Sequence, residues 1–269
     1  MNSMQYLINV PIEDVKQCFS FAEQLYQKKA ASLKQFGRKQ LIREKNDYIA
    51  DHVIGKSVEI GFKRFLEINC GISFKVDFDI WEDQLIHDNG NDLATVFFNG
   101  ESKKFTFKTD IKGTRKSSKW LLVERHKIVN FNTKIYVVGL LDSIPEGKAF
   151  ENNPYGYLNH SWNVRILGYA LNRDIVDPQT KRGWIEYKKG DHLYSPSILE
   201  KCKSRNRNLS HSEYQKLLNN VIKNIPENWN RHIGGPLDCE INYGLPIKWL
   251  RNTNLDWENF CKIINKYSS

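Results

Sequence analysis

The 269-residue sequence is short of cysteine and has no long hydrophobic run. Its five cysteines are odd in number, lie far apart and form no CxxC pair, so we expect neither a disulfide framework nor a zinc ribbon. No stretch approaches the roughly 18 apolar residues of a membrane span, and the first residues lack a charged region followed by an apolar run. These absences lead us to expect a cytoplasmic protein with no membrane partner.

The sequence is rich in apolar residues and in positive charge. Hydrophobic residues make up 40% of the chain and aromatic residues 12%, which suffices for a substantial core. The formal net charge of +9 favours a polyanionic partner, because lysine and arginine gain from counterion release near phosphates. Charge alone does not identify nucleic acid, since basic proteins without such a partner also occur.

Hydrophobic periodicity predicts helices near both ends and a sheet in the middle. Apolar residues at helical spacing follow Pro11, and the same spacing continues from about Asn46 to Glu67. Beyond Gly71 the pattern has a period of two, and Asn99-Gly100 predicts a hairpin turn. The expected strands span residues 72–78, 93–98, 105–111, 120–124, 135–141, 162–171 and 184–187. Helices are expected at 194–201, 212–224 and 256–266, with an irregular stretch between the last two.

One short motif carries candidate chemistry. Asp110 and Lys112 are two residues apart in a predicted strand, so their side chains project to the same face. Asp92 begins the strand one hairpin earlier and supplies a second carboxylate. Two carboxylates and the backbone carbonyl of Ile111 are hard oxygen ligands that suit Mg²⁺. Lys112 beside them would orient or help deprotonate a water and offset charge in the transition state.

This pattern resembles the PD-(D/E)XK nuclease superfamily and, within it, type II restriction endonucleases. The family's first acid maps to Asp92, its (D/E)xK to Asp110-Ile111-Lys112, and its helical glutamate to Glu59. The resemblance covers roughly residues 50 to 200. It implies an α/β domain with a central mixed sheet flanked by helices, and a Mg²⁺-dependent endodeoxyribonuclease that cuts by direct water attack. The expected products carry 5′-phosphate and 3′-hydroxyl ends.

The match departs from the family at one position. Asn91 stands where the family has a proline, and 18 residues separate Asp92 from Asp110. The alternatives for the first acid are Asp77, Asp79 and Asp88. Glu59 has an alternative role as an exposed helix residue paired with Lys56 or Lys63.

We expect a single nuclease domain over 1–269, with a catalytic core at about 46–200. Residues 1–45 form a basic helical segment, and 201–269 form an appendage for DNA recognition or dimerisation. The expected partner is double-stranded DNA, and a homodimer would place two centres on the two strands of a symmetric site. The turn after the motif is either a phosphate-binding loop or a solvated one, and its residues are Thr114, Arg115, Lys116, Ser117 and Ser118.

Several other features have two interpretations. The basic residues between Lys28 and Lys45 form either a solvated helix face or a phosphate contact, and the run 201–207 either reads base edges or is a surface loop. His160 and Trp162 are either a binding pair or residues with a purely structural role. The same two interpretations apply to His126. Two other functions fit the same motif: a phage or repair nuclease acting on structured or modified DNA, and a catalytically silent DNA-binding protein.

Overall fold

The structure is a computed structural model that describes residues 6–29, 44–80, 91–145, 148–176, 184–195, 216, 220, 232–233, 237 and 239–269. Asp88, the run 201–207 and most of the basic stretch after Lys28 lie outside these residues. Of the expected helix at 194–201 only residues 194 and 195 are described, and neither is helical, because Tyr194 ends a short strand. In the expected helix at 212–224, only residues 216 and 220 are described, and both are helical.

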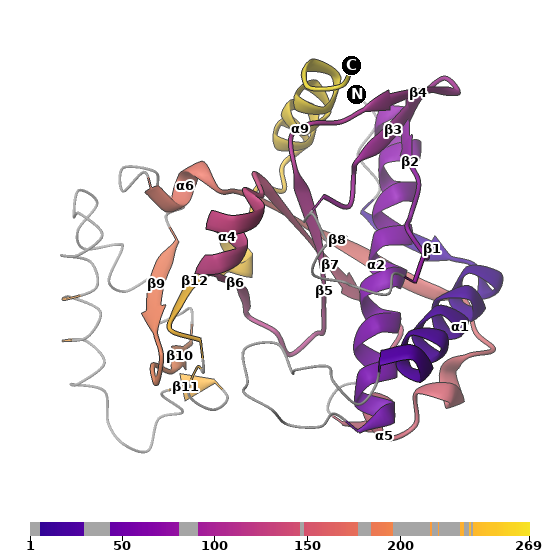
Figure 1. The fold of residues 1–269 in the computed structure, drawn as a ribbon, viewed down its shortest axis with the longest axis horizontal. Helices are drawn as coiled ribbons and strands as arrows, with labels where there is room; N and C mark the ends of the chain where they lie inside the picture. The colour runs from indigo at the N-terminus through magenta and orange to yellow at the C-terminus, as the bar shows by residue number, and fades with distance from the viewer. Residues whose placement is uncertain are drawn as a thin grey trace.

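The chain forms a mixed α/β fold, as predicted (Figure 1). Its main helices are α1 (Ile12–Lys29), α2 (Lys45–Cys70), α4 (Arg125–Phe131) and α9 (Asn254–Lys266), with shorter α5 (Ala149–Asn152) and α6 (Arg173–Val176). The strands are β1 (Leu7–Val10), β2 (Ile72–Phe74), β3 (Thr95–Phe98), β4 (Glu101–Lys104), β5 (Thr109–Thr114), β6 (Trp120–Glu124), β7 (Ile135–Leu141), β8 (Trp162–Leu171), β9 (Ile185–Lys188), β10 (Leu193–Tyr194), β11 (His232–Ile233) and β12 (Ile241–Pro246). Short 3-10 turns are η2 (Pro154–Tyr157) and η3 (Ile247–Trp249).

The central sheet has the strand order β1-β8-β7-β5. β5 and β7 are parallel, and β8 is antiparallel to both β7 and β1, so the sheet is mixed as expected. β7 is almost wholly buried and rich in valine, isoleucine and leucine, which is typical of a strand covered on both faces. β5 is the last strand of this sheet and therefore presents one backbone edge to the elements beside it.

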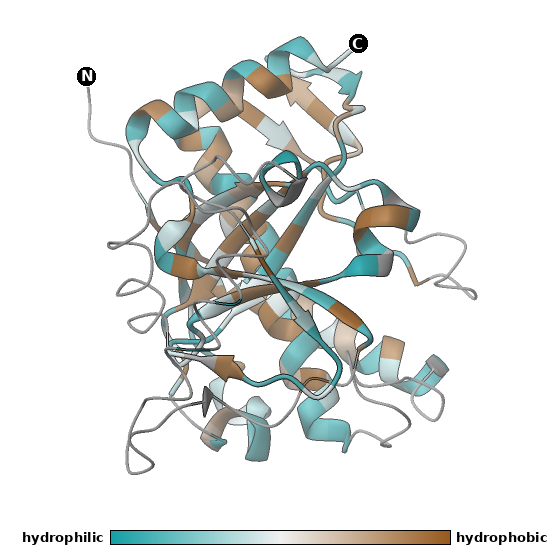
Figure 2. Ribbon diagram, turned by 90° about the vertical axis from the view of Figure 1, so that its left-hand side faces the viewer, coloured by the Kyte–Doolittle hydropathy of each residue, from teal (hydrophilic) through white to brown (hydrophobic). Residues whose placement is uncertain are grey.

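Two apolar cores lie on the two faces of the central sheet. One face packs against α1, α2 and α9, and the buried side chains of this main core run from Ile8 to Ile264. The other face packs against the sheet β6-β12-β9, with α4 beside it (Figure 1). Hydrophobic and hydrophilic segments alternate along the helices and strands, as expected for elements with one face in a core (Figure 2).

The long helix α2 brings the candidate glutamate to the sheet. Its 26 residues carry a continuous buried stripe that includes Tyr48, Val53, Phe62 and Leu66. The helix ends at Cys70. The next residue, Gly71, has a φ of +65°, in the left-handed region, and its N–H donates to the carbonyls of Leu66 and Glu67. The predicted helix over 46–67 is confirmed and extends slightly at both ends.

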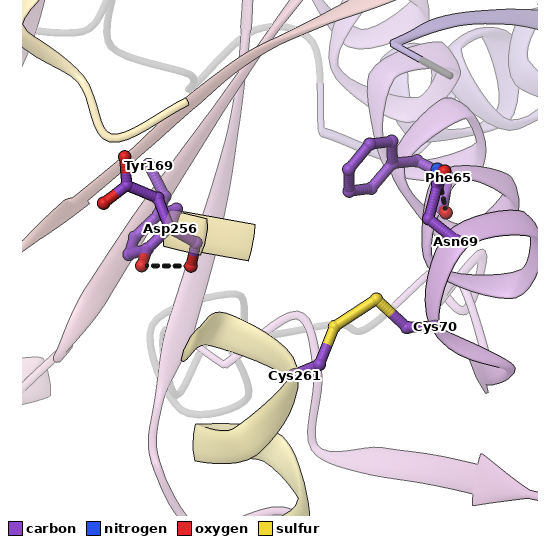
Figure 3. Close-up of a disulfide and its surroundings, with 6 residues drawn as sticks. All are labelled: Phe65, Asn69, Cys70, Tyr169, Asp256 and Cys261. Carbon is purple, nitrogen blue, oxygen red and sulfur yellow. Dashed lines mark hydrogen bonds between the residues drawn. A yellow bond between two sulfur atoms is a disulfide. The ribbon is translucent and has the colours of Figure 1, made fainter. Parts of the chain in front are cut away.

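A disulfide joins the end of α2 to α9, and our expectation of no disulfide framework is wrong at this pair. Cys70 and Cys261 lie 191 residues apart in sequence, which is why spacing gave no signal (Figure 3). Tyr169 of β8 also donates a hydrogen bond of 2.8 Å to the carbonyl of Asp256, at the start of α9 (Figure 3). The C-terminal helix is therefore fixed to the main core by a covalent bond as well as by packing.

Several strands differ from the prediction. β1 and β12 were not expected, and β1 pairs with β8 in the central sheet. The hairpin at Asn99-Gly100 is confirmed, with both residues at positive φ, but it joins β3 to the short exposed strand β4. The expected strand at 105–111 starts only at Thr109. Among the described helices, none combines the length and apolar character required to cross a membrane.

Candidate active site

The segment before β3 lies along the open edge of β5. The backbone N–H of Asp92 donates to the carbonyl of Thr109 at 2.8 Å. The Asn91 side chain accepts from the Thr109 N–H at 3.0 Å and donates to the Phe105 carbonyl at 3.1 Å. Asn91 thus fixes the position of Asp92 through its own side chain.

Asp92 contacts the middle of the predicted motif. Its carboxylate oxygen Oδ2 accepts a hydrogen bond of 2.6 Å from the backbone N–H of Ile111. In an extended strand the N–H and C=O of one residue point to the same edge, so the Ile111 carbonyl faces the edge where Asp92 lies. The Ile111 side chain is buried in the main core, as the proposed use of its backbone requires.

Asp110 and Lys112 form an ion pair on the opposite face of β5 from the Ile111 side chain. The Lys112 Nζ lies 2.6 Å from Asp110 Oδ2, and the two side chains are 26% and 16% exposed. This proximity confirms that the two side chains project together, as the period of a strand predicts. Both groups are accessible enough to meet a bound substrate.

A glycine allows β5 to approach α2 closely. A Cβ atom at Gly113 would lie 3.0 Å from Ile54 Cγ2, 3.1 Å from the Ile54 carbonyl oxygen and 3.2 Å from Gly55 Cα. Two of these three contacts are with backbone, which cannot rotate away. The absence of a side chain at Gly113 therefore sets how near the motif lies to the helix that carries Glu59.

Glu59 is paired with Lys56, one helical turn earlier. The Lys56 Nζ lies 3.0 Å from Glu59 Oε1 and 2.7 Å from Oε2, so both carboxylate oxygens are engaged. The alternative pairing with Lys56 is thus the observed one, but the pair is not exposed, because the side chains are only 16% and 13% accessible. Lys63 pairs instead with Glu67.

The acidic groups lie close enough to perturb one another. Burial raises the pKa of Asp92 well above its ordinary value, and the charges of Glu59 and Asp110 raise it further. Burial also raises the pKa of Glu59; Lys56 opposes this shift, while Asp110 and Asp77 reinforce it. The four acids Glu59, Asp77, Asp92 and Asp110 therefore share one electrostatic environment.

This environment fits a divalent cation. The four carboxylates outnumber the two lysines, Lys56 and Lys112, so the cluster carries excess negative charge when its acids are ionised. Within the part of the chain that the structure describes, no three acidic, histidine or cysteine side chains are gathered into a metal cage. Mg²⁺ does not require one, because it usually keeps several waters and is held by one or two carboxylates. Asp92, Asp110 and the Ile111 carbonyl are the groups available for that role.

The expected phosphate-binding turn is partly occupied by ion pairs within the protein. Arg115 pairs with Asp51 of α2 at 2.8 Å and with Glu151 of α5. Lys116 lies 3.5 Å from Asp142. Arg115 therefore has a structural role between β5 and two helices, and contact of this turn with DNA stays a prediction.

The remaining candidates differ in their exposure. Trp162 is buried and its Nε1 donates to the Tyr157 carbonyl at 3.1 Å, so it is a core residue. His160 is exposed, and the His126 side chain lies outside the described residues. A cavity of about 350 Å³ lies between α4 and β12, lined by residues such as Arg125, Val129 and Ile241, none of which belongs to the motif.

Sequence reasoning missed two members of the cluster. The sequence indicates Lys56 only as a surface partner of Glu59, and Asp77 only as an alternative to Asp92. The three-residue spacing of Lys56 and Glu59 on a predicted helix indicates their contact but not their burial. Comparison of the chain with protein-family models, with curated proteins and with solved structures found no match.

Proposed function

We propose that this chain is a Mg²⁺-dependent endodeoxyribonuclease with a restriction-endonuclease-like core. The observation that carries the proposal is the convergence at the edge of β5, where Asp92 bonds to the Ile111 amide while Asp110 and Lys112 flank that residue. Glu59 reaches the same environment from α2. The proposal is supported by Glu59, Asp92 and Asp110, which come from three separate segments and whose charges act on one another.

Each residue of the site has its own role in the proposed hydrolysis of the phosphodiester. Asp92 and Asp110, with the Ile111 carbonyl, would hold a divalent ion, which when bound supplies a Lewis acid for the phosphate and acidifies a water. Lys112, held beside Asp110, orients the attacking water and offsets negative charge that develops on the phosphate. The water oxygen bonds to phosphorus as the bond to the 3′ oxygen breaks, which yields 5′-phosphate and 3′-hydroxyl ends.

The proposed substrate is double-stranded DNA. The net charge of +9 favours a polyanion. Sequence-specific restriction is the narrower proposal. It implies a homodimer, because two centres related by a twofold axis cut both strands of a symmetric site.

Cleavage of supercoiled plasmid with Mg²⁺ or with EDTA tests the proposal. Wild-type protein should cut only with Mg²⁺, and Asp110→Ala or Lys112→Ala should remove nearly all cleavage with the fold intact, because both side chains act mainly in the transition state. Glu101→Ala and Lys104→Ala remove the same charges from the exposed strand β4 and serve as matched controls. They should cut at the wild-type rate.

The products separate the competing functions. Discrete fragments from ordinary duplex support a restriction endonuclease, whereas cutting confined to branched or modified DNA supports a structure-selective nuclease. Salt-sensitive binding with no cleavage under any divalent ion would identify a silent DNA-binding protein and refute the nuclease. Near-normal turnover by Asp110→Ala or Lys112→Ala would refute the site.

A further inference from the structure

Lys56 is a basic residue within the cluster of acids, and the sequence does not indicate that it is buried there. Its Nζ contacts both oxygens of Glu59, at 2.7 and 3.0 Å, and it lies 5.3 Å from the centre of the Phe21 ring and 5.8 Å from that of Phe78. A bidentate carboxylate on one side and two aromatic rings around it hold the ammonium group in place. Lys56 is therefore a fixed positive charge, unlike a flexible lysine on the surface.

A second ion pair on α2 shows that the burial of Lys56 is unusual for a lysine on this helix. Lys63 and Glu67 are 3.9 Å apart and are 37% and 40% exposed, which is an ordinary pair on the helix surface. Lys56 and Glu59 are closer and mostly buried, and burying an ammonium group is costly unless other charges compensate. Burial lowers the pKa of Lys56, but Glu59, Asp92 and Asp77 together outweigh this and raise it.

The pairing determines which acids remain for a divalent ion. Asp92 accepts a hydrogen bond from the Ile111 amide of β5, and Asp110 is paired with the Lys112 ammonium of the same strand. Glu59 has both oxygens on Lys56. Sites with two metal ions place them about 3.5–4 Å apart and need carboxylates for each. Here Glu59, the carboxylate that α2 brings to the cluster, is already bound to a lysine.

We propose that Lys56 takes the place of a second metal ion, holding Glu59 and restricting the site to one divalent cation at Asp92 and Asp110. The inference rests on the proposed function, because it concerns the same acids. The ammonium group contributes a permanent positive charge beside the site and repels a further dication. Lys56 is thus a positioning residue that sets the number of ions.

Counting bound Mn²⁺ ions by electron paramagnetic resonance tests this role without DNA. Wild-type protein should bind one Mn²⁺ ion per chain at the site. Lys56→Met keeps the length of the side chain and suits the two rings, but it frees Glu59, so a second ion should bind. The Lys56→Met/Glu59→Gln double variant removes the freed carboxylate and should return to one. Lys63→Met, on the surface of the same helix, should also bind one ion.

The outcomes distinguish this inference from the proposed function. Two ions on wild-type protein, or one ion on Lys56→Met that retains the wild-type circular dichroism spectrum, would overturn the role of Lys56 alone. If Lys56→Met does not fold, the count on wild-type protein still decides, because two ions contradict the inference. No ion on wild-type protein would overturn the proposed function, and the role of Lys56 would fall with it.

Discussion

The close approach of β5 to α2 predicts a large effect from adding one methyl group. In Gly113→Ala the new Cβ would lie 3.0 Å from Ile54 Cγ2, 3.1 Å from the Ile54 carbonyl oxygen and 3.2 Å from Gly55 Cα. Overpacking of this kind costs about 1–3 kcal/mol, and the backbone contacts place the cost toward the upper end. Since a loss of 1 kcal/mol lowers Tm by roughly 2–4 °C in a chain of this size, we expect a Tm lower by about 4–10 °C.

The same change should also impair catalysis, because it shifts β5, the strand that carries Asp110 and Lys112. The matched control is Gly55→Ala, on the other side of this contact, where a Cβ would meet no atom of the described residues within 4 Å. Alanine in a helix interior is favoured over glycine by about 0.5–1 kcal/mol, so this variant should be slightly more stable than wild type. Thermal unfolding and plasmid cleavage of both variants provide the measurement. A Gly113→Ala protein as stable as Gly55→Ala would refute the packing argument.

Two further predictions concern Asp92 and the disulfide. The fold raises the pKa of Asp92, so ionisation of this carboxyl destabilises the metal-free protein as the pH rises from the unfolded pKa, near 3.9, through the higher pKa of the folded state. Asp92→Asn should therefore raise Tm at pH 8 and have little effect at pH 4. Equal effects at the two pH values would contradict the pKa shift. The Cys70–Cys261 bond closes a loop of 191 residues, which in the chain-entropy model stabilises the folded state by about 5 kcal/mol. Dithiothreitol should therefore lower the Tm of wild-type protein and leave that of Cys70→Ser/Cys261→Ser unchanged. Equal responses of the two proteins would argue against the bond.

Local patterns predicted much of the fold and the motif. The spacing of apolar residues located α2 and the strands β7 and β8, because each has a buried face with a clear period. The (D/E)xK spacing placed Asp110 and Lys112 together because alternation in a strand is a local property. Asp92 was expected at the start of a strand, whereas the structure has it in the turn before β3, which begins at Thr95.

The features that escaped prediction depend on contacts between distant segments. β12 contains Gly244 and Pro246, which indicate a break when considered alone, yet the strand forms between β6 and β9. The partner of Cys70 lies in the last helix, and the partners of Arg115 lie on α2 and α5. The burial of Lys56 depends on Phe21 of α1 and on Phe78, which periodicity within α2 does not reveal.

The location of a bound ion tests the central claim most directly. In a crystal of the protein soaked with Mn²⁺, the anomalous difference map should show one peak between the carboxylates of Asp92 and Asp110, within reach of the Ile111 carbonyl. The same soak of Asp110→Asn should weaken or abolish that peak. A fully occupied Mn²⁺ ion elsewhere on the chain, with no density at the edge of β5, would contradict the account.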